Sequence, residues 1–131
     1  MTSVADTRLL ITLKFPPTEE TAQRTKKLVT QEIRRTLLIP SIVIAEYIKI
    51  AGGKLGFDAA LTHINEIEDR GAIIVELDRK TAVEAGKVLL KNQGMPMADA
   101  LIAATSLTHK AEHILTDDSH FQEMGFKIKW L

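Results

Sequence analysis

Short apolar runs and longer amphipathic stretches alternate along the chain, separated by turn residues. The apolar runs are Ser3–Ala5, Leu37–Ile39, Ala72–Leu77, His113–Thr116 and Phe126–Trp130. Runs of this length between breakers are typical of buried strands, whereas a helix needs a longer periodic pattern. The pattern therefore predicts five strands with helical segments between them.

Helical signals fill the segments between these runs. The segment that begins at Thr18 has a capping threonine, acids in its first turn, and Arg34 and Arg35 in its last. Further helices are predicted over residues 40–50, 57–69, 78–92 and 98–110, with a short turn of helix over 120–124. We expect Gly52 and Gly53 to close the helix that opens at residue 40.

Strands that alternate with helices imply right-handed β-α-β crossovers, and such crossovers produce a mostly parallel sheet. We therefore predict an α/β fold of three layers, α/β/α, with a mostly parallel five-stranded sheet. The length of 131 residues is usual for one domain, and no linker divides it. Residues 1–131 are expected to form a single domain.

Composition narrows the class of protein. The chain has no cysteine, which excludes a disulfide framework and a thiolate zinc site. The richest apolar stretch, Leu37–Ala51, contains Glu46 and Lys49 and is shorter than the roughly 20 residues of a membrane helix. Met1–Arg8 shows no signal-peptide pattern. We expect a cytoplasmic protein without a membrane segment.

Charge is unevenly distributed although the net charge is zero. Residues 1–54 hold nine Lys and Arg against five Asp and Glu, and residues 55–131 hold eight against twelve. A basic N-terminal half fits a phosphate-backbone partner, and it fits ordinary solvated helix faces equally well.

Carboxylates follow three of the predicted strands. Asp6 ends the first strand, Asp78 the third, and Asp117 and Asp118 the fourth. Ligands of open α/β sheets bind beyond the carboxyl ends of the strands, where the strand order reverses. If the first and fourth strands are neighbours there, Asp6 faces Asp117 or Asp118. Asp78 is interpreted as the cap of the helix that it precedes.

Two further acids stand in apolar surroundings. Glu46 lies within IVIAEYIKI, where an unpaired carboxylate would be costly to bury, so it needs a partner. That partner is either Lys49, three residues on, or a functional site. Asp99 lies in the first turn of its predicted helix, where dipole or cap stabilisation is the alternative to a functional role.

Four carboxylates in one pocket would repel one another unless divalent cations neutralised them. Oxygen ligands without cysteine favour Mg²⁺ or Mn²⁺ over zinc. His109 and His113 have the spacing of a helical metal pair, but the predicted helix ends between them. Gly52-Gly53-Lys54 lacks the leading glycine and the Ser or Thr of a phosphate loop.

The acidic segments resemble, in order and spacing, the four motifs of PIN-domain proteins, and in particular those of the small VapC toxins of toxin–antitoxin pairs. These segments read ADTRLLI, IPSIVIAEYIKI, MPMADALIAAT and ILTDDSHF. The resemblance implies that Asp6, Glu46 and Asp99 are the first three acids. The family's Thr-any-Asp-any-any-Phe pattern falls on residues 116–121 and selects Asp118 as the fourth.

The resemblance also implies an activity and partners. It predicts a ribonuclease that hydrolyses RNA with water activated on Mg²⁺ or Mn²⁺ held by the four acids. Thr7 and Thr116 match hydroxyl positions beside the acids. Arg8 stands where relatives usually have Asn, and it either contacts a phosphate of the substrate or points to solvent. A homodimer and a cognate antitoxin protein are the expected partners.

A non-catalytic receiver-like phospho-acceptor module is the competing hypothesis, because such modules also gather acids and magnesium at strand ends. It requires a lysine near the last strand, for which Lys127 and Lys129 are candidates. It also requires a pair of acids near the start of the chain, where Asp6 stands alone.

Overall fold

The computed structural model describes all 131 residues and has one five-stranded sheet. The strands are β1 (Ser3–Ala5), β2 (Leu37–Pro40), β3 (Ile73–Val75), β4 (His113–Leu115) and β5 (Ile128–Lys129). The helices are α1 (Thr7–Lys14), α2 (Glu19–Arg35), α3 (Ser41–Leu55), α4 (Phe57–Asp69), α5 (Arg79–Lys91), α6 (Met97–Thr108) and α7 (Ser119–Glu123). None of the helices has the length and apolarity that a bilayer-spanning segment requires.

The sheet has the strand order β3-β2-β1-β4-β5, and every neighbouring pair is parallel. The chain therefore moves outward from β1 to β3, then returns across the sheet to β4 on the other side of β1. Ser3 pairs with both Leu37 and His113, and Ala5 pairs with Leu115. The strand order thus reverses between β1 and β4, so these two strands are neighbours, which is the condition under which Asp6 was expected to face Asp117 or Asp118.

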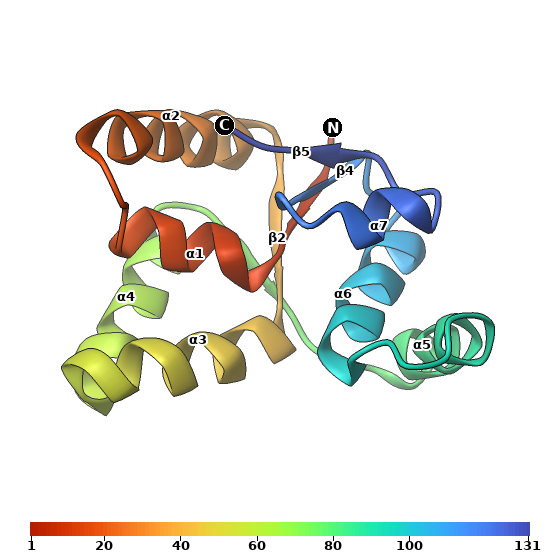
Figure 1. The fold of residues 1–131 in the computed structure, drawn as a ribbon. Coiled ribbons are helices and arrows are strands. Elements are labelled where there is room, and N and C mark those ends of the chain that lie inside the picture. Colours follow the sequence, from red (N-terminus) through yellow and green to blue (C-terminus); the bar gives the residue numbers. More distant parts are fainter.

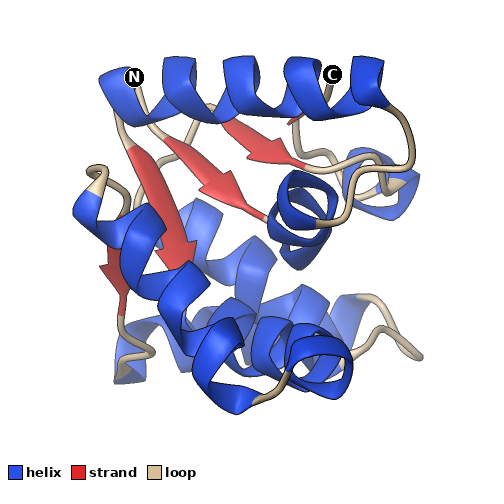
Figure 2. Ribbon diagram, turned by 90° about the vertical axis from the view of Figure 1, so that its left-hand side faces the viewer, coloured by secondary structure: helices blue, strands red, loops and turns tan.

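Helices cover both faces of the sheet, which confirms the three-layer α/β/α prediction. Right-handed crossovers that run outward from β1 place α1–α4 on one face, and the return and the last crossover place α5–α7 on the other. Figure 1 shows this arrangement, with α1 and α2 on one side of β2 and α6 and α7 on the other. In Figure 2 the strand arrows point in the same direction.

The main hydrophobic core surrounds the central strands. Every residue of β1 and β2 is buried, and Val4, Leu37, Ile39 and Ile114 are completely inaccessible to solvent. Strands that are buried on both faces need continuous apolar runs, which explains why the sequence signal for them is not alternating. A smaller apolar cluster lies between α5 and α6. Together, the main core and this smaller cluster hold the carboxyl ends of the central strands in place.

Two helices differ from the prediction. The segment Thr7–Lys14 forms α1, where no helix was predicted, because β-branched Thr7, Ile11 and Thr12 weaken the local helix signal. The other difference concerns α3, which continues through Gly52 and Gly53. It ends only at Gly56, whose φ of 92° belongs to the left-handed region.

The edge strands are shorter than predicted. The third strand covers Ile73–Val75 and the fifth covers Ile128–Lys129, although the apolar runs extend over residues 72–77 and 126–130. Each edge strand has one neighbour, so only residues in register with that neighbour form a ladder. The short edges also leave few unpaired backbone groups for other chains.

Candidate active site

Asp6 lies where the chain leaves β1 and enters α1, at the reversal of strand order. Its side chain is the N-cap of α1: Oδ1 accepts a hydrogen bond of 2.7 Å from the backbone N–H of Thr7. Its other oxygen, Oδ2, accepts a hydrogen bond of 2.7 Å from the Thr116 hydroxyl. Asp6 is 5% exposed, and burial raises its pKa, while these two hydrogen bonds oppose the rise.

Glu46 reaches the same region from α3. Its Oε1 accepts a hydrogen bond of 2.6 Å from the hydroxyl of Thr7. Lys49 forms no ion pair with it, so the alternative interpretation of Glu46 as half of a surface pair is wrong. Thr7 thus holds two carboxylates: it donates its backbone N–H to Asp6 and its hydroxyl to Glu46.

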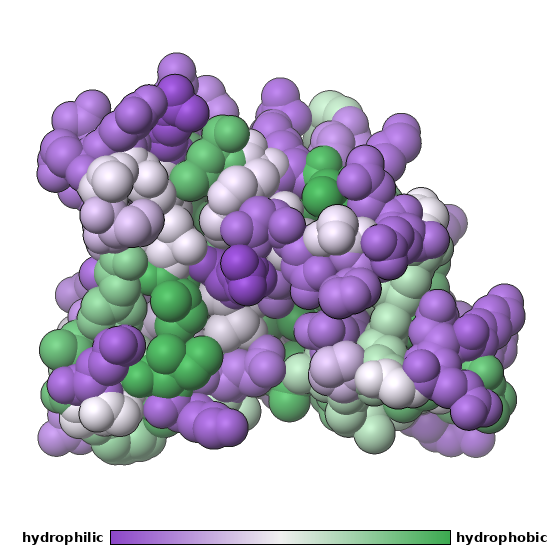
Figure 3. Space-filling model, viewed as in Figure 1, coloured by the Kyte–Doolittle hydropathy of each residue, from purple (hydrophilic) through white to green (hydrophobic).

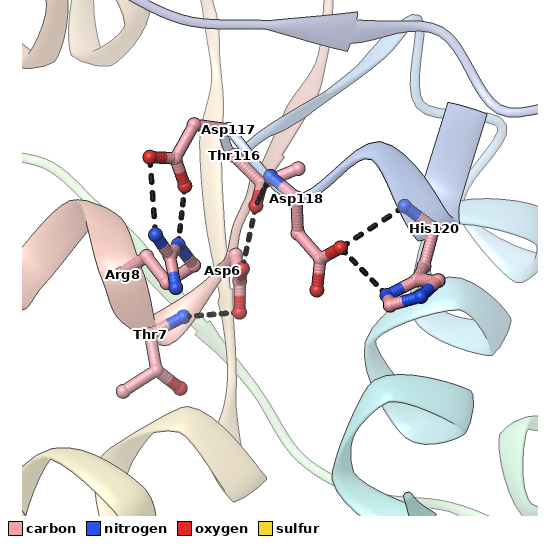
Figure 4. A network of polar contacts seen from close by, with 7 residues as sticks. All are labelled: Asp6, Thr7, Arg8, Thr116, Asp117, Asp118 and His120. Carbon is pink, nitrogen blue, oxygen red and sulfur yellow. Dashed lines mark hydrogen bonds and ion pairs between the residues drawn. The ribbon is translucent and has the colours of Figure 1, made fainter. Parts of the chain in front are cut away.

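The end of β4 supplies the opposite wall. Thr116 is fully buried, donates to Asp6, and accepts a hydrogen bond of 3.0 Å from the backbone N–H of Asp118. Asp118 is the N-cap of α7, and its Oδ1 accepts from the backbone N–H of His120 at 3.0 Å. The His120 Nδ1 lies 2.9 Å from the same oxygen. Figure 4 shows this chain of contacts from Thr7 to His120.

Asp99 lies in the first turn of α6, on the face of the sheet opposite to Glu46. It is not a cap, because Pro96 occupies the N-cap position, and its carboxylate makes no hydrogen bond within the protein. Burial, together with the charges of Asp6, Asp118 and Glu46, raises its pKa to about 6. Helix-dipole stabilisation would lower the pKa, so burial and the surrounding carboxylates outweigh it.

All four acids line one cavity of about 420 Å³, together with Thr7, Arg8, Ile11, Thr12 and Ile50. Figure 3 shows hydrophilic side chains gathered in the hollow between the α1–α3 side of the molecule and the α6–α7 side. The donor set consists of carboxylate oxygens and hydroxyls, which suits Mg²⁺ or Mn²⁺. No three carboxylate or imidazole groups are close enough to hold one ion as they stand.

Arg8 and Asp117 form the rim of the cavity. The Arg8 guanidinium makes a two-pronged ion pair with the Asp117 carboxylate, through Nε and through Nη2, the latter 3.1 Å from Oδ2 (Figure 4). This contact lowers the pKa of Asp117. Of the two adjacent aspartates, Asp118 therefore lines the cavity and Asp117 points to the rim. No pattern in the sequence pairs Arg8 with a residue 109 positions away.

The remaining polar signals lie elsewhere. Lys127 and Lys129 do not line the acidic cavity, and Lys129 instead lies 3.5 Å from the buried carboxylate of Glu32. Asp78 caps α5 by accepting from the backbone N–H of Thr81 at 2.8 Å. His109 is the C-cap of α6, its Nδ1 lies 3.1 Å from the backbone carbonyl of Thr105, and it does not line the acidic cavity. The sequence did not single out His120, whose position two residues after a helix-capping Asp was the available signal.

Comparison with known proteins agrees with this architecture. The family model for the PIN domain matches residues 4–127. Comparison with curated protein sequences found no match.

Solved structures with the same fold include three bacterial proteins. VapC20 of Mycobacterium tuberculosis, a toxin that cleaves the sarcin–ricin loop, superimposes with a TM-score of 0.78 at 16% identity over 96% of both chains. VapBC2 of Rickettsia felis, bound to a promoter DNA fragment, gives 0.74 at 16% over 99% of this chain and 98% of that one. DNA-bound VapBC of Salmonella typhimurium gives 0.73 at 22% with the same coverage.

Proposed function

The chain belongs to the PIN-domain family, and from this premise we propose that it is a metal-dependent ribonuclease that acts as the toxin of a toxin–antitoxin pair. One observation supports the chemistry most strongly. Carboxylates from four separate segments, those of Asp6, Glu46, Asp99 and Asp118, line a single cavity at the reversal of strand order. A site that gathers uncompensated acids is built to attract cations.

The four carboxylates would hold Mg²⁺ or Mn²⁺. When bound, such an ion supplies an activated water and stabilises the negative charge of the leaving oxygen in phosphodiester hydrolysis. The protein fixes the orientation of two of these carboxylates in advance, although a bound ion would have to draw the carboxylates closer together. Thr116 and Thr7 orient both oxygens of Asp6, and the Thr7 hydroxyl orients Glu46. Such outer contacts typically change metal affinity or activity by about 10–100-fold when they are removed.

Asp99 contributes a group that titrates near neutral pH. Its pKa of about 6 follows from burial beside the other carboxylates. Below that pH it holds a proton on the cavity wall, and above it the charge becomes available to a cation. Proton release and cation binding at this side chain are therefore linked.

Arg8 is the proposed contact to the RNA backbone. Asp117 occupies the Nε and one Nη2 donor of its guanidinium and thereby fixes its plane at the rim of the cavity. A guanidinium has five N–H donors, so others are available to a phosphate oxygen. Because the ion pair is exposed, this contact orients Arg8 without immobilising it as firmly as a buried pair would.

An antitoxin protein and a second copy of the chain are the proposed partners. The support for an antitoxin is that similar structures are complexes of VapC-type toxins with VapB proteins. Large apolar side chains from the second half of α3 to the start of α4 offer a surface for protein contacts, since Ile50 is 41% exposed, Leu55 51% and Phe57 59%. Light scattering on the purified chain tests the homodimer, which would have about twice the mass of 14.5 kDa.

The experiment that tests the nuclease proposal is a cleavage assay on end-labelled structured and single-stranded RNAs, with Mg²⁺, with Mn²⁺ and with a chelator. We expect cleavage that the chelator abolishes and that Asp6→Asn and Asp99→Asn eliminate. Asp69→Asn is the matched control, because Asp69 is an exposed acid without side-chain partners. Chelator-resistant cleavage, or full activity of Asp6→Asn, would contradict the proposal. A phosphotransfer assay in the same buffer tests the receiver-like alternative, and we expect no phosphorylation.

A further inference from the structure

A second cavity adjoins the acidic cavity on the side of α6 and α7. Its volume is about 300 Å³, and Asp99 belongs to the walls of both cavities. The loop of residues 92–96, between α5 and α6, forms one side, and His120, Glu123 and Met124 form the other. Apart from Asp99, none of these groups has a part in the proposed hydrolysis. Because the two cavities share a wall, one RNA nucleotide can occupy both.

The second cavity combines apolar surface with hydrogen-bonding groups. Met95 and Met124 supply polarisable thioethers, and the fully buried ring of Phe121 lies behind them. The imidazole of His120 is held by the Asp118 carboxylate and lines the second cavity, whereas Asp118 lines the acidic cavity. The volume matches the lower end of small-molecule sites. A flat aromatic ligand with polar edges suits such a cavity, and RNA bases that are not paired meet that description.

The negative charge of the cavity wall favours a base over a phosphate as the ligand. Two carboxylates, Asp99 and Glu123, line the cavity, and no lysine or arginine does. A phosphate would be repelled there, whereas an amino group would be attracted. Adenine, cytosine and guanine each carry an exocyclic amino group, and uracil carries none. The carbonyl oxygens of uracil would face carboxylate oxygens without a proton between them.

We propose that this second cavity binds an unpaired, amino-bearing base of the RNA beside the scissile phosphate, with Glu123 as the residue that discriminates against uracil. Gln93 stands on the same wall and adds an amide that can both donate to and accept from the base edge. The proposal rests on the nuclease function proposed above, because it assigns the neighbouring base of the same substrate. A base site at this position would make cleavage depend on which base of the RNA occupies the cavity beside α7.

The chain carries its own reporters for this site. It has four methionines, of which Met95 and Met124 line the second cavity while Met1 and Met97 do not. With ¹³C-labelled methionine methyl groups, each nucleotide can be titrated against two reporters and two internal controls in one spectrum. The probes are AMP, UMP and ribose 5-phosphate with Mg²⁺ present. The experiment requires no RNA cleavage.

We expect AMP to shift the Met95 and Met124 methyl signals and to leave those of Met1 and Met97 in place. AMP should bind about tenfold more tightly than UMP, the preference of one specific base contact. Glu123→Gln should reduce that preference to about threefold or less, whereas Asp69→Asn should preserve it. Equal shifts with ribose 5-phosphate, unmoved Met95 and Met124 signals, or an unchanged preference in Glu123→Gln would overturn the proposal.

Failure of this proposal and failure of the nuclease proposal give different results. A chain that selects AMP over UMP but cleaves no RNA keeps the second cavity as a base site and removes the enzymatic role. A chain that cleaves RNA with Mg²⁺ while nucleotides leave Met95 and Met124 unmoved keeps the enzymatic role and overturns the base site. Asp6→Asn should retain the preference for AMP over UMP, because Asp6 does not line the second cavity.

Discussion

Asp6 and Asp78 occupy equivalent places in the chain, but the pKa values of their carboxyl groups are shifted in opposite directions. Each follows a strand and caps the next helix, with Oδ1 accepting from a backbone N–H at 2.7 Å for Asp6 and 2.8 Å for Asp78. Burial raises the pKa of Asp6, whereas hydrogen bonds from Thr81 lower the pKa of Asp78. The same local motif thus produces a site in one place and a plain cap in the other.

The difference arises from the position of the two strands in the sheet. The strand before Asp6, β1, is central and borders the reversal of strand order, so β4 places Thr116 and Asp118 beside it. The strand before Asp78, β3, is at the edge, and Asp78 is exposed to solvent. Topology therefore decides which capping carboxylate meets other carboxylates. Local sequence does not contain that information.

Asparagine at the two caps gives the largest expected contrast. Asp6→Asn should lower metal-dependent RNA cleavage by about a thousandfold, because it removes a ligand charge whose contribution is several kcal/mol in the transition state. Asp78→Asn should leave cleavage within about twofold and should lower only the melting temperature, since an amide caps a helix nearly as well. Initial rates of both variants measure this. Equal losses of activity in the two would remove the distinction between site and cap.

Removal of the Thr116 hydroxyl should have the next largest effect. Thr116→Val leaves Asp6 Oδ2 buried without its donor, which should cost about 1–3 kcal/mol of stability and raise the Asp6 pKa further. Activity should fall about 10–100-fold. Thr116→Ser retains the hydroxyl and should therefore keep most of the stability and most of the activity. Denaturant unfolding and cleavage rates report them separately, and a Thr116→Val variant as active as wild type would show that Asp6 needs no fixed orientation.

Asp99→Asn should stabilise the chain when no metal is bound. The pKa of Asp99 is raised from 3.8 to about 6, so the folded state binds more protons in that interval. The free energy of unfolding therefore falls as pH rises through the interval, and the variant should not show this fall. With allowance for solvent screening, the gain at neutral pH should be about 1 kcal/mol.

The contribution of Asp78 to the free energy of unfolding should change with pH in the opposite direction. Its pKa lies below the ordinary 3.8, so its contribution to stability is present above that value and is lost as pH falls through the lowered pKa. Urea unfolding with a chelator across a pH series measures both variants. An Asp99→Asn variant that loses stability at neutral pH would mean that the Asp99 charge is already compensated within the protein.

Arg8→Ala should have the smallest effect. The Arg8–Asp117 pair is exposed, so its loss should change stability by less than about 1 kcal/mol. If Arg8 contacts a phosphate, the salt dependence of RNA binding should decrease by about one unit of slope. Lys26→Ala, a change at another exposed cation, is a suitable comparison. A salt dependence identical to wild type would place Arg8 outside the RNA contact surface.

The sequence was sufficient for the fold class and for the succession of strands and most helices along the chain, because strong apolar runs and cap signals define them. It did not determine which strands are neighbours in the sheet. It was not sufficient for α1, whose β-branched residues resemble a strand and become helical through packing against α2 and α3. It was also not sufficient for the end of α3, because Gly52 and Gly53 are tolerated inside a helix that packs well.

The candidate site was likewise predictable only in part. Asp6 and the Asp117-Asp118 pair could be anticipated as strand-end residues, and the family resemblance selected Asp118. Glu46 could be anticipated as a carboxylate that needs a partner, with Lys49 as the alternative to a site. The contacts that position them could not, because Thr7 meets Glu46 across 39 residues and Thr116 meets Asp6 across 110. The Arg8–Asp117 pair and the second cavity likewise depend on tertiary neighbours. Spatial partners of this kind leave no periodic trace in a single sequence.

Paramagnetic broadening of the backbone amide signals by Mn²⁺ is the most direct test of whether the acidic cavity holds a divalent ion. We predict that substoichiometric Mn²⁺ selectively broadens signals from the ends of β1 and β4 and from the starts of α1 and α6, that Mg²⁺ competes, and that Asp6→Asn abolishes the effect while Asp78→Asn does not. Broadening centred on Asp78 or spread evenly over the surface, or undiminished broadening in Asp6→Asn, would contradict it.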